Sequence, residues 1–312
     1  MAATGLSTSP SRHSPTTARA DDARSLAARL PDLLVAARRV AANVLLGVHG
    51  RRRAGSGETF WQFRPYMPGE PARRIDWRRS ARDQHLYVRE REWEASQTVW
   101  LWADLSPSMD FRSDLSPVSK LDRAVVLMLA TAEMLARGGE RVGLPGLVEP
   151  QLGRNAADRF AAALARAENL PDWPDIRGVK RFSELVIVSD CLSEIDTIRN
   201  RCRAVADIGA TMHLLQVTDP AEESFPYDGR FEFRDPESGA LWLSESAGSL
   251  RERYIARLAA HRGEIALSAR KAGSTFGVHH TDRPASEGLL FLHSSLSGTP
   301  LTRSGAAPAN RA

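Results

Sequence analysis

Four polar side chains in this 312-residue sequence stand where they could hold a metal ion together. Asp104, Ser106 and Ser108 follow the apolar run 99–103 at a spacing of two, and Asp190 follows a second apolar run further along the chain. Residues two apart in an extended segment point to the same side, so one loop can present the first three. Hydroxyl and carboxylate oxygens are ligands that Mg²⁺ prefers, and Mg²⁺ retains several waters. The pattern predicts a magnesium site with an open position.

The elements that must position these residues alternate between strands and helices. We expect strands over 99–104, 185–189, 211–217 and 274–279, a broken strand over 141–152, a hairpin over 231–243, and helices over 119–137, 156–169, 194–208 and 250–271. This alternation predicts an α/β fold with a doubly wound, mostly parallel sheet and helices on both faces. Ligands bind such sheets beyond the carboxyl ends of the strands, which is where Asp104 and Asp190 stand.

The composition of the chain divides it into five parts. Segments 1–20 and 294–312 are rich in small and polar residues and are expected to be disordered, and 98–293 is the expected main domain. Segment 21–49 has helical apolar spacing, with a break expected near Leu30 because Pro31 follows it. Segment 50–97 is expected to be a small β-rich extension, with strands over 60–66 and 85–92.

Charge and cysteine content bound the class of protein. The chain carries 42 Lys and Arg against 38 Asp and Glu, a formal net charge of +4. Its two cysteines form no metal-binding array with histidine, which disfavours a zinc cluster. The sequence contains no apolar run of the ~18 residues that a membrane helix needs, and its start lacks the apolar core of a secretory signal. We therefore expect a cytoplasmic protein with no direct membrane span.

Two sequence strings resemble known families. The string DLSPS at 104–108 resembles the DxSxS element of the metal-ion-dependent adhesion site in von Willebrand factor type A domains. The run YMPGEPARRIDW at 66–77 is longer and more specific, and it resembles the family called domain of unknown function 58. Together with later matches, the resemblance covers roughly residues 45–282. It implies a von Willebrand factor A-like domain.

The resemblance also implies roles for residues and partners. The serines matching Ser106 and Ser108 would bind the metal directly, and the aspartates matching Asp104 and Asp190 would act mostly through water. The implied activity is a non-enzymatic protein-interaction module in which a partner carboxylate takes the open metal position. The implied partner is a MoxR-type AAA+ ATPase with its client protein, for which the chain would serve as adaptor or co-chaperone.

The sequence departs from the adhesion-site motif at one point. Type A domains supply a threonine ligand from another loop, but the corresponding stretch 147–155 contains neither Ser nor Thr. Asn155 could supply the missing oxygen, or Arg154 could occupy the position and repel a cation. Both alternatives remain open from the sequence.

The sequence is less consistent with two other functions. A magnesium-dependent phosphohydrolase would use Asp104 as nucleophile, but such enzymes usually carry a second Asp two residues later, where this chain has Ser106. The sequence also contains no GxxxxGK[ST] phosphate-binding loop and no GxSxG nucleophile elbow. Segment 51–92 holds eleven Arg, which could bind nucleic acid, but six interleaved acidic residues favour internal pairing. No nucleic-acid partner is expected. In that segment, Asp76 and Trp77 are interpreted as structural, with the Trp buried.

Overall fold

The computed structural model describes residues 15–49, 60–67, 70–72, 75–82, 85–91, 96–167 and 171–298. The disorder predicted for 1–14 and for 299–312 lies outside these residues. The chain divides into two compact units: residues 46–96 form one, and residues 1–45 with 97–312 form the other.

The larger unit is built on one six-stranded sheet. Its strand order is β10-β7-β6-β3-β4-β5. The strands are β3 (Thr98–Ala103), β4 (Arg141–Leu144), β5 (Val148–Gln151), β6 (Glu184–Ser189), β7 (Thr211–Thr218) and β10 (Thr275–His280). All neighbours pair in parallel except β5, which runs antiparallel to β4 at one edge. The chain winds outward in both directions from the boundary between β3 and β6, which confirms the doubly wound, von Willebrand factor A-like fold expected from the sequence.

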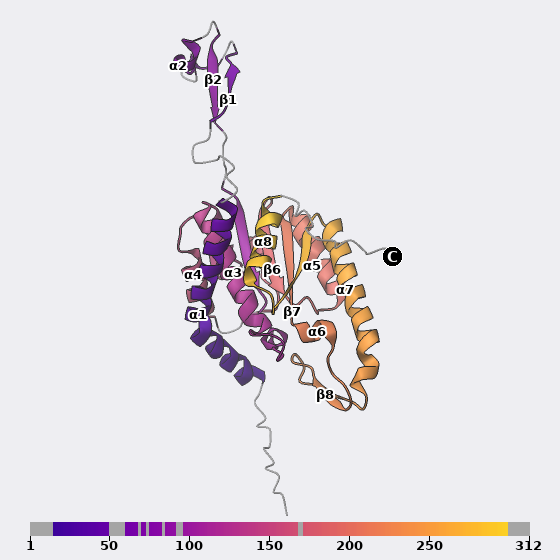
Figure 1. The fold of residues 1–312 in the computed structure, drawn as a ribbon. Coiled ribbons are helices and arrows are strands. Elements are labelled where there is room, and N and C mark those ends of the chain that lie inside the picture. The colour runs from indigo at the N-terminus through magenta and orange to yellow at the C-terminus, as the bar shows by residue number, and fades with distance from the viewer. Residues whose placement is uncertain are drawn as a thin grey trace, which may run out of the picture. The chain divides into compact units, whose positions relative to one another are not determined.

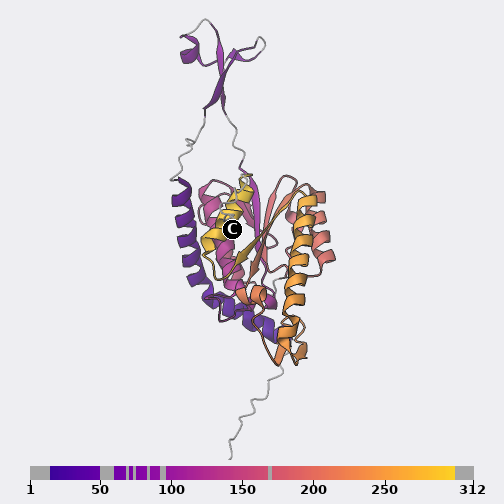
Figure 2. The same ribbon diagram turned by 45° about the vertical axis from the view of Figure 1, so that its right-hand side comes forward.

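Helices cover both faces of this sheet (Figures 1 and 2). One face carries α3 (Lys120–Arg137), α4 (Ala156–Leu164) and α8 (Ala285–Leu296), and the other carries α5 (Ile195–Ile208) and α7 (Arg251–Lys271). Helix α1 (Pro15–His49) lies beside α3 and α4, where Arg29 pairs with Asp122 at 2.8 Å and Arg38 pairs with Asp158 at 2.6 Å. Shorter elements complete the unit: η2 (Pro107–Asp110), η3 (Ile176–Gly178), α6 (Pro220–Ser224), the hairpin β8 (Phe231–Arg234) with β9 (Leu241–Ser244), and η4 (Ala247–Leu250).

The core lies between the central strands and α3. Strands β3 and β6 are buried on both faces, as the continuous apolar runs predict for central parallel strands. Nearly every residue of α3 is buried, so this helix is the inner layer of its face. Its start is fixed by Ser119, whose side chain accepts a hydrogen bond from the backbone N–H of Asp122 at 3.1 Å. The capped start of α3 therefore lies directly after the loop that holds Asp104.

Three sequence expectations about the ends of this unit are wrong. Helix α1 begins at Pro15, inside the segment expected to be disordered, and proline suits a first helical position because no N–H is needed there. The helix also continues through Pro31 and bends instead of breaking (Figure 2). Helix α8 was not predicted and ends at Leu296, so residues 294–296 are helical. Its Leu289 and Leu292 are fully buried, and this packing stabilises it.

The smaller unit contains β1 (Phe60–Pro65) paired antiparallel with β2 (Tyr87–Arg91), within two residues of the predicted bounds. Between them, α2 (Trp77–Ser80) forms one turn. Asp76 is its N-cap and accepts a hydrogen bond from the N–H of Arg79 at 3.0 Å. The expectation that Trp77 is buried is wrong, since the residue is 61% exposed. A single helical turn has too little surface to enclose an indole ring.

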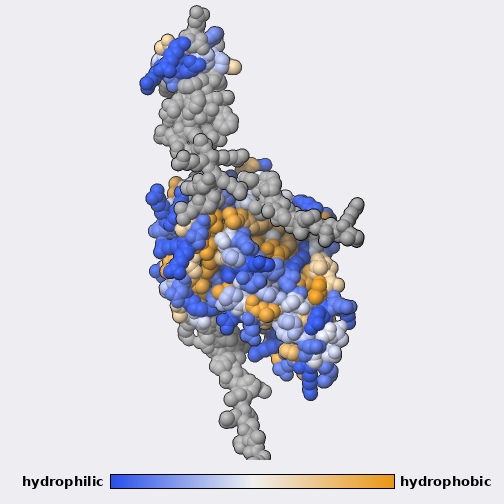
Figure 3. All heavy atoms as spheres, in the orientation of Figure 1, coloured by the Kyte–Doolittle hydropathy of each residue, from blue (hydrophilic) through white to orange (hydrophobic). Residues whose placement is uncertain are grey.

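None of the described helices is both long and apolar enough to cross a membrane. The face around α8 nevertheless exposes some apolar atoms, which gather among charged ones in Figure 3. Val278 of β10 and Leu290 of α8 are exposed hydrophobic residues in this part of the fold.

Candidate functional site

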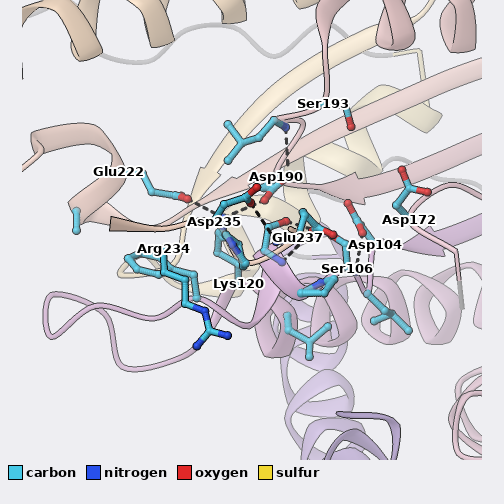
Figure 4. Close-up of a pocket in the computed structure, with 18 of the residues that line it drawn as sticks. Asp104, Ser106, Lys120, Asp172, Asp190, Ser193, Glu222, Arg234, Asp235 and Glu237 are labelled. Atoms are coloured by element: carbon cyan, nitrogen blue, oxygen red, sulfur yellow. Dashed lines mark hydrogen bonds and ion pairs between the residues drawn. The ribbon is translucent and has the colours of Figure 1, made fainter. Parts of the chain in front are cut away.

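A pocket of about 900 Å³ opens at the carboxyl ends of β3 and β6. Its floor is formed by polar residues from the loops after these strands, namely Asp104, Ser106, Ser108 and Asp190. The structure therefore brings together all four residues that the sequence predicted as metal ligands. Figure 4 shows Asp104 and Ser106 close to Asp190 and to Lys120 of α3. The pocket lies where the strand order reverses, the usual ligand position in a doubly wound sheet.

We call residues 104–108 the serine loop. Its carboxylate, Asp104, is buried, with only 5% of its surface exposed. One oxygen accepts a hydrogen bond from the backbone N–H of Ser106 at 2.9 Å, and the other accepts from the hydroxyl of Ser189 at 2.7 Å. Burial raises the pKa of Asp104 to about 6, although these hydrogen bonds act to lower it. The negative charge of Asp190 raises the pKa further. Among the described residues, no positively charged side chain forms an ion pair with it. The site is therefore short of positive charge at Asp104.

The two serines of the loop face each other. Their Oγ atoms are 3.1 Å apart, within hydrogen-bonding distance. Ser106 has an extended backbone, and the following turn η2 brings Ser108 back towards it. Adjacent oxygen ligands of an octahedral Mg²⁺, each at 2.0–2.1 Å, lie about 3 Å apart. The separation of the two hydroxyl oxygens therefore matches a pair of direct magnesium ligands.

Asp190 is paired with a buried lysine. Lys120 is only 1% exposed, and its Nζ lies 3.0 Å from Asp190 Oδ2 and 2.6 Å from Glu222 Oε1. Burial alone would lower the pKa of Lys120, but the two carboxylates outweigh it and raise the pKa. Glu222 is held in turn by the capping box of α6, where its other oxygen accepts from the N–H of Asp219 at 2.9 Å. Lys120 is thus a fixed internal cation between two loops.

The loop carrying Asp190 is held by hydrogen bonds from β7 and α7. Gln216 donates to the carbonyl of Asp190 at 2.7 Å, and His261 donates to the carbonyl of Cys191 at 2.8 Å. Cys191 adopts a left-handed backbone with φ of 55°, which is costly for a non-glycine residue. Burial raises the pKa of its thiol well above the usual range, which suits a residue packed in the core. These contacts hold the strained turn and fix the direction of Asp190.

The donor set fits Mg²⁺ in part. The hydroxyls of Ser106 and Ser108 with the carboxylate of Asp104 make a hard-oxygen group on one loop, and Asp104 has unbalanced negative charge. One carboxylate oxygen of Asp190 already binds Lys120, so Asp190 would reach a metal only through water. Within the described ranges, no three His, Cys, Asp or Glu side chains are grouped for a metal. Any cation here would depend on the serine hydroxyls.

The loop that should supply a threonine does not reach the pocket. Asn155 stands before α4 with its side-chain oxygen 3.5 Å from Arg159 Nη1, and neither Asn155 nor Arg154 lines the pocket. Both sequence alternatives for this position are therefore wrong. The loop leads directly into α4, and the pocket is lined on that side by Leu164 at the end of α4 and by Pro171 and Asp172 beyond it. Asp172 pairs with Arg201 at 2.7 Å.

The wall of the pocket is aromatic and comes from a part of the chain that sequence reasoning did not assign to the site. Phe225, Tyr227, Phe233 and Tyr254 line it, and Phe225 contacts the other three rings at centroid distances of 4.7–5.7 Å. The turn of the β8–β9 hairpin adds Asp235 and Glu237 (Figure 4).

Three residues of the candidate site were not anticipated from the sequence: Lys120, Glu222 and Glu237. Lys120 is one of only three lysines in the chain and begins a helix with a long apolar middle, which is a weak signal. The spacing of Asp219 and Glu222 matches a capping box, but it carries no sign of a lysine partner. Glu237 lies in a turn with no pattern that points to Ser108, 129 residues away.

The chain matches one family model and is similar to proteins of two mycobacteria. The family model described as Protein of unknown function DUF58 matches residues 62–264. The chain is 29% identical to Uncharacterized protein Rv1480 of Mycobacterium tuberculosis and equally to Uncharacterized protein Mb1516 of Mycobacterium bovis, over 87% of this chain and 90% of each relative.

Two solved structures match part of the chain. They are conserved hypothetical protein BatB from Bacteroides thetaiotaomicron, with a TM-score of 0.37, and an aerotolerance-related membrane protein from Bacteroides fragilis, with a TM-score of 0.39. Each is 16% identical and matches over 65% of this chain and 100% of its own. At these values the likeness supports no statement about function.

Proposed function

This chain belongs to the DUF58 family, and from that premise we propose that it is a non-enzymatic protein-interaction module with a metal-dependent docking site. The docking site consists of Asp104, Ser106 and Ser108, with Asp190 behind them. A partner presents a carboxylate to this site, and Mg²⁺ is the cation that makes the contact favourable.

The observation that carries the proposal is the combination of Asp104 and the serine pair. A carboxylate that is 5% exposed and has no ion pair among the described residues lies beside two hydroxyl oxygens 3.1 Å apart, at the floor of a large pocket. When bound, Mg²⁺ supplies a positive charge with an exchangeable position. Ser106 and Ser108 hold it directly, and Asp104 and Asp190 orient its waters. The pocket provides room for a protein side chain to reach it.

The contacts of the polar residues favour binding over catalysis. Among the described residues, neither hydroxyl of Ser106 and Ser108 is bonded to a histidine or lysine that could act as a general base, and Lys120 is engaged by two carboxylates. Both oxygens of Asp104 accept hydrogen bonds, which suits a positioning role better than the nucleophile of a phosphohydrolase. We propose that the protein is not an enzyme.

The partner we propose is a MoxR-type AAA+ ATPase together with its client protein, in the cytoplasm. The support for this partner is the family resemblance, which implies such an ATPase. The chain would act as the adaptor or co-chaperone that connects client and ATPase. No nucleic acid and no direct membrane insertion belong to this proposal.

The test is a pull-down from the native cell lysate with the tagged full-length protein, in Mg²⁺ and in EDTA, read by mass spectrometry. We expect an AAA+ ATPase in Mg²⁺ and its loss in EDTA. The Ser106→Ala, Ser108→Ala double variant separates this effect from Mg²⁺ at the ATPase's own nucleotide site, because only the docking site is changed. Ser249→Ala, an exposed serine outside the pocket lining, is the matched control.

Two results would contradict the proposal. Equal recovery of every partner by the wild type and the double serine variant would show that Ser106 and Ser108 do not form a docking site. Hydrolysis of a generic phosphate ester that is lost in Asp104→Asn would replace the binding module by an enzyme.

A further inference from the structure

The turn of the β8–β9 hairpin places a carboxylate of the chain itself at the docking site. The backbone N–H of Ser108 donates a hydrogen bond to Glu237 Oε1 at 3.1 Å. Figure 4 shows Glu237 in the same pocket as Asp104 and Ser106. The contact joins the loop after β3 to a turn 129 residues later. Glu237 is thus the carboxylate that reaches the serine loop from outside it.

The turn is built to hold this side chain in one place. Asp235 accepts a hydrogen bond from the N–H of Glu237 at 3.0 Å, and its own backbone N–H and carbonyl bond to Ala240 and Gly239, each at 2.8 Å. Pro236 restricts the backbone between them. Gly239 has φ of 72°, a conformation that glycine adopts without strain. Glu237 is therefore presented by an ordered turn, although the turn itself is exposed.

The charge around Glu237 is unbalanced. The pocket lining contains six acidic side chains and two basic ones, and the basic ones are Lys120 and Arg234. Lys120 is already bound by Asp190 and Glu222. A cation held by Asp104, Ser106 and Ser108 would attract the carboxylate of Glu237, which already reaches Ser108.

We propose that Glu237 is the chain's own carboxylate ligand for the cation held by Asp104, Ser106 and Ser108, and that an acidic partner side chain docks by replacing it. This inference rests on the proposed function and deepens it. Glu237 supplies the ligand that the loop before α4 lacks, because Asn155 does not reach the pocket. The partner segment is then acidic, with an apolar side chain that fits the aromatic wall of Phe225 and Phe233.

The experiment measures Mn²⁺ binding to the full-length protein by calorimetry and by water-proton relaxation. Glu237→Gln keeps an oxygen that can accept from Ser108 but removes the charge, so the turn is preserved. We expect this variant to bind Mn²⁺ on the order of tenfold more weakly and to give a higher relaxation rate per bound ion, because water fills the vacated position. Glu232→Gln, on the same hairpin but outside the pocket lining, is the matched control.

The outcomes separate this inference from the proposed function. Equal Mn²⁺ affinity and equal relaxation in the wild type and Glu237→Gln would overturn the role of Glu237 while the metal-dependent docking site stands, provided that Ser106→Ala with Ser108→Ala abolishes binding. No Mn²⁺ binding to the wild type at millimolar concentration would overturn both. In the pull-down described above, Glu237→Gln should retain several-fold more partner in Mg²⁺, since the competing carboxylate is gone.

Discussion

Lys120 is the charged residue around which the candidate site is organised. Its ammonium group is buried between Asp190 and Glu222, and the ring of Phe111 lies 5.8 Å from it. A buried charge of this kind is costly to create but more costly to leave half-paired. The lysine therefore holds the Asp190 loop and the start of α6 in a fixed relation, and it leaves Asp104 as the carboxylate available to a cation.

Replacing Lys120 by methionine should destabilise the larger unit strongly. The variant Lys120→Met leaves two carboxylates buried side by side without a counter-charge, and removing one partner of such a pair costs about 3–5 kcal/mol. The measurement is the free energy of unfolding in urea. The exposed Lys271→Met should change it by less than about 0.5 kcal/mol. A loss below about 1 kcal/mol for Lys120→Met would show that the internal ion pair is unimportant.

The central elements were predictable because their sequence pattern matches their final burial. Strands β3 and β6 are buried on both faces, and an apolar run such as Leu185 to Val188 has few other stable positions. Helices α6 and α8 were not predictable in this way, because α6 is one short capped turn and α8 is stabilised by contacts with α3 and the sheet.

The residues of the candidate site were likewise predictable only in part. Asp104 and Asp190 were predictable because each follows a central strand, and parallel strands bring their carboxyl ends to one edge. Glu237 reaches that edge through the β8–β9 turn, whose position depends on the aromatic contacts of the whole unit. A pattern local to the sequence contains no information about such a contact.

The packing of β4 beside the edge strand β5 depends on a glycine. A Cβ at Gly143 would lie 2.8 Å from Pro150 Cγ and 2.9 Å from Trp100 Cε3, with the Pro150 backbone N at 3.0 Å. We expect Gly143→Ala to cost about 1–3 kcal/mol through this overpacking. Gly263→Ala in α7 is the matched control, because a Cβ there meets nothing within 4 Å; it should stabilise by about 0.5–1 kcal/mol. Thermal unfolding of the two variants tests the contrast, and equal shifts would contradict it.

At the scale of the whole larger unit, one buried cluster joins α3 to the outermost parallel strand. Arg123 of α3 donates to His279 Nε2 at 3.0 Å and to the carbonyl of Thr281 at 2.9 Å, and His279 is 4% exposed. Nε2 of His279 is therefore an acceptor, so the ring must be neutral for this contact to form. Burial lowers the pKa of His279 to about 3, and the charges of Arg123 and His280 contribute.

This cluster predicts how the stability of the unit depends on pH. In the unfolded chain His279 takes up a proton near its ordinary pKa of 6.5, whereas in the folded protein it does so only near 3. The unfolded state thus binds more protons between these values, so stability is full above pH 6.5 and falls by roughly 1 kcal/mol per pH unit below it. Urea unfolding at pH 7 and pH 5 should show this loss in the wild type and a smaller loss in His279→Gln. The same pH dependence in both proteins would contradict the assignment.

The burial of both cysteines has a practical consequence for following the hairpin. The chain contains only Cys191 and Cys202, and both thiols are enclosed and have raised pKa values. Thiol reagents such as maleimides react with exposed thiolates, so the folded protein should react only very slowly with a maleimide dye. A single cysteine introduced by Ser238→Cys in the exposed β8–β9 turn would then be labelled selectively, without first removing the native thiols. A fluorophore there would report departure of the turn from the serine loop as a change in emission while a partner binds.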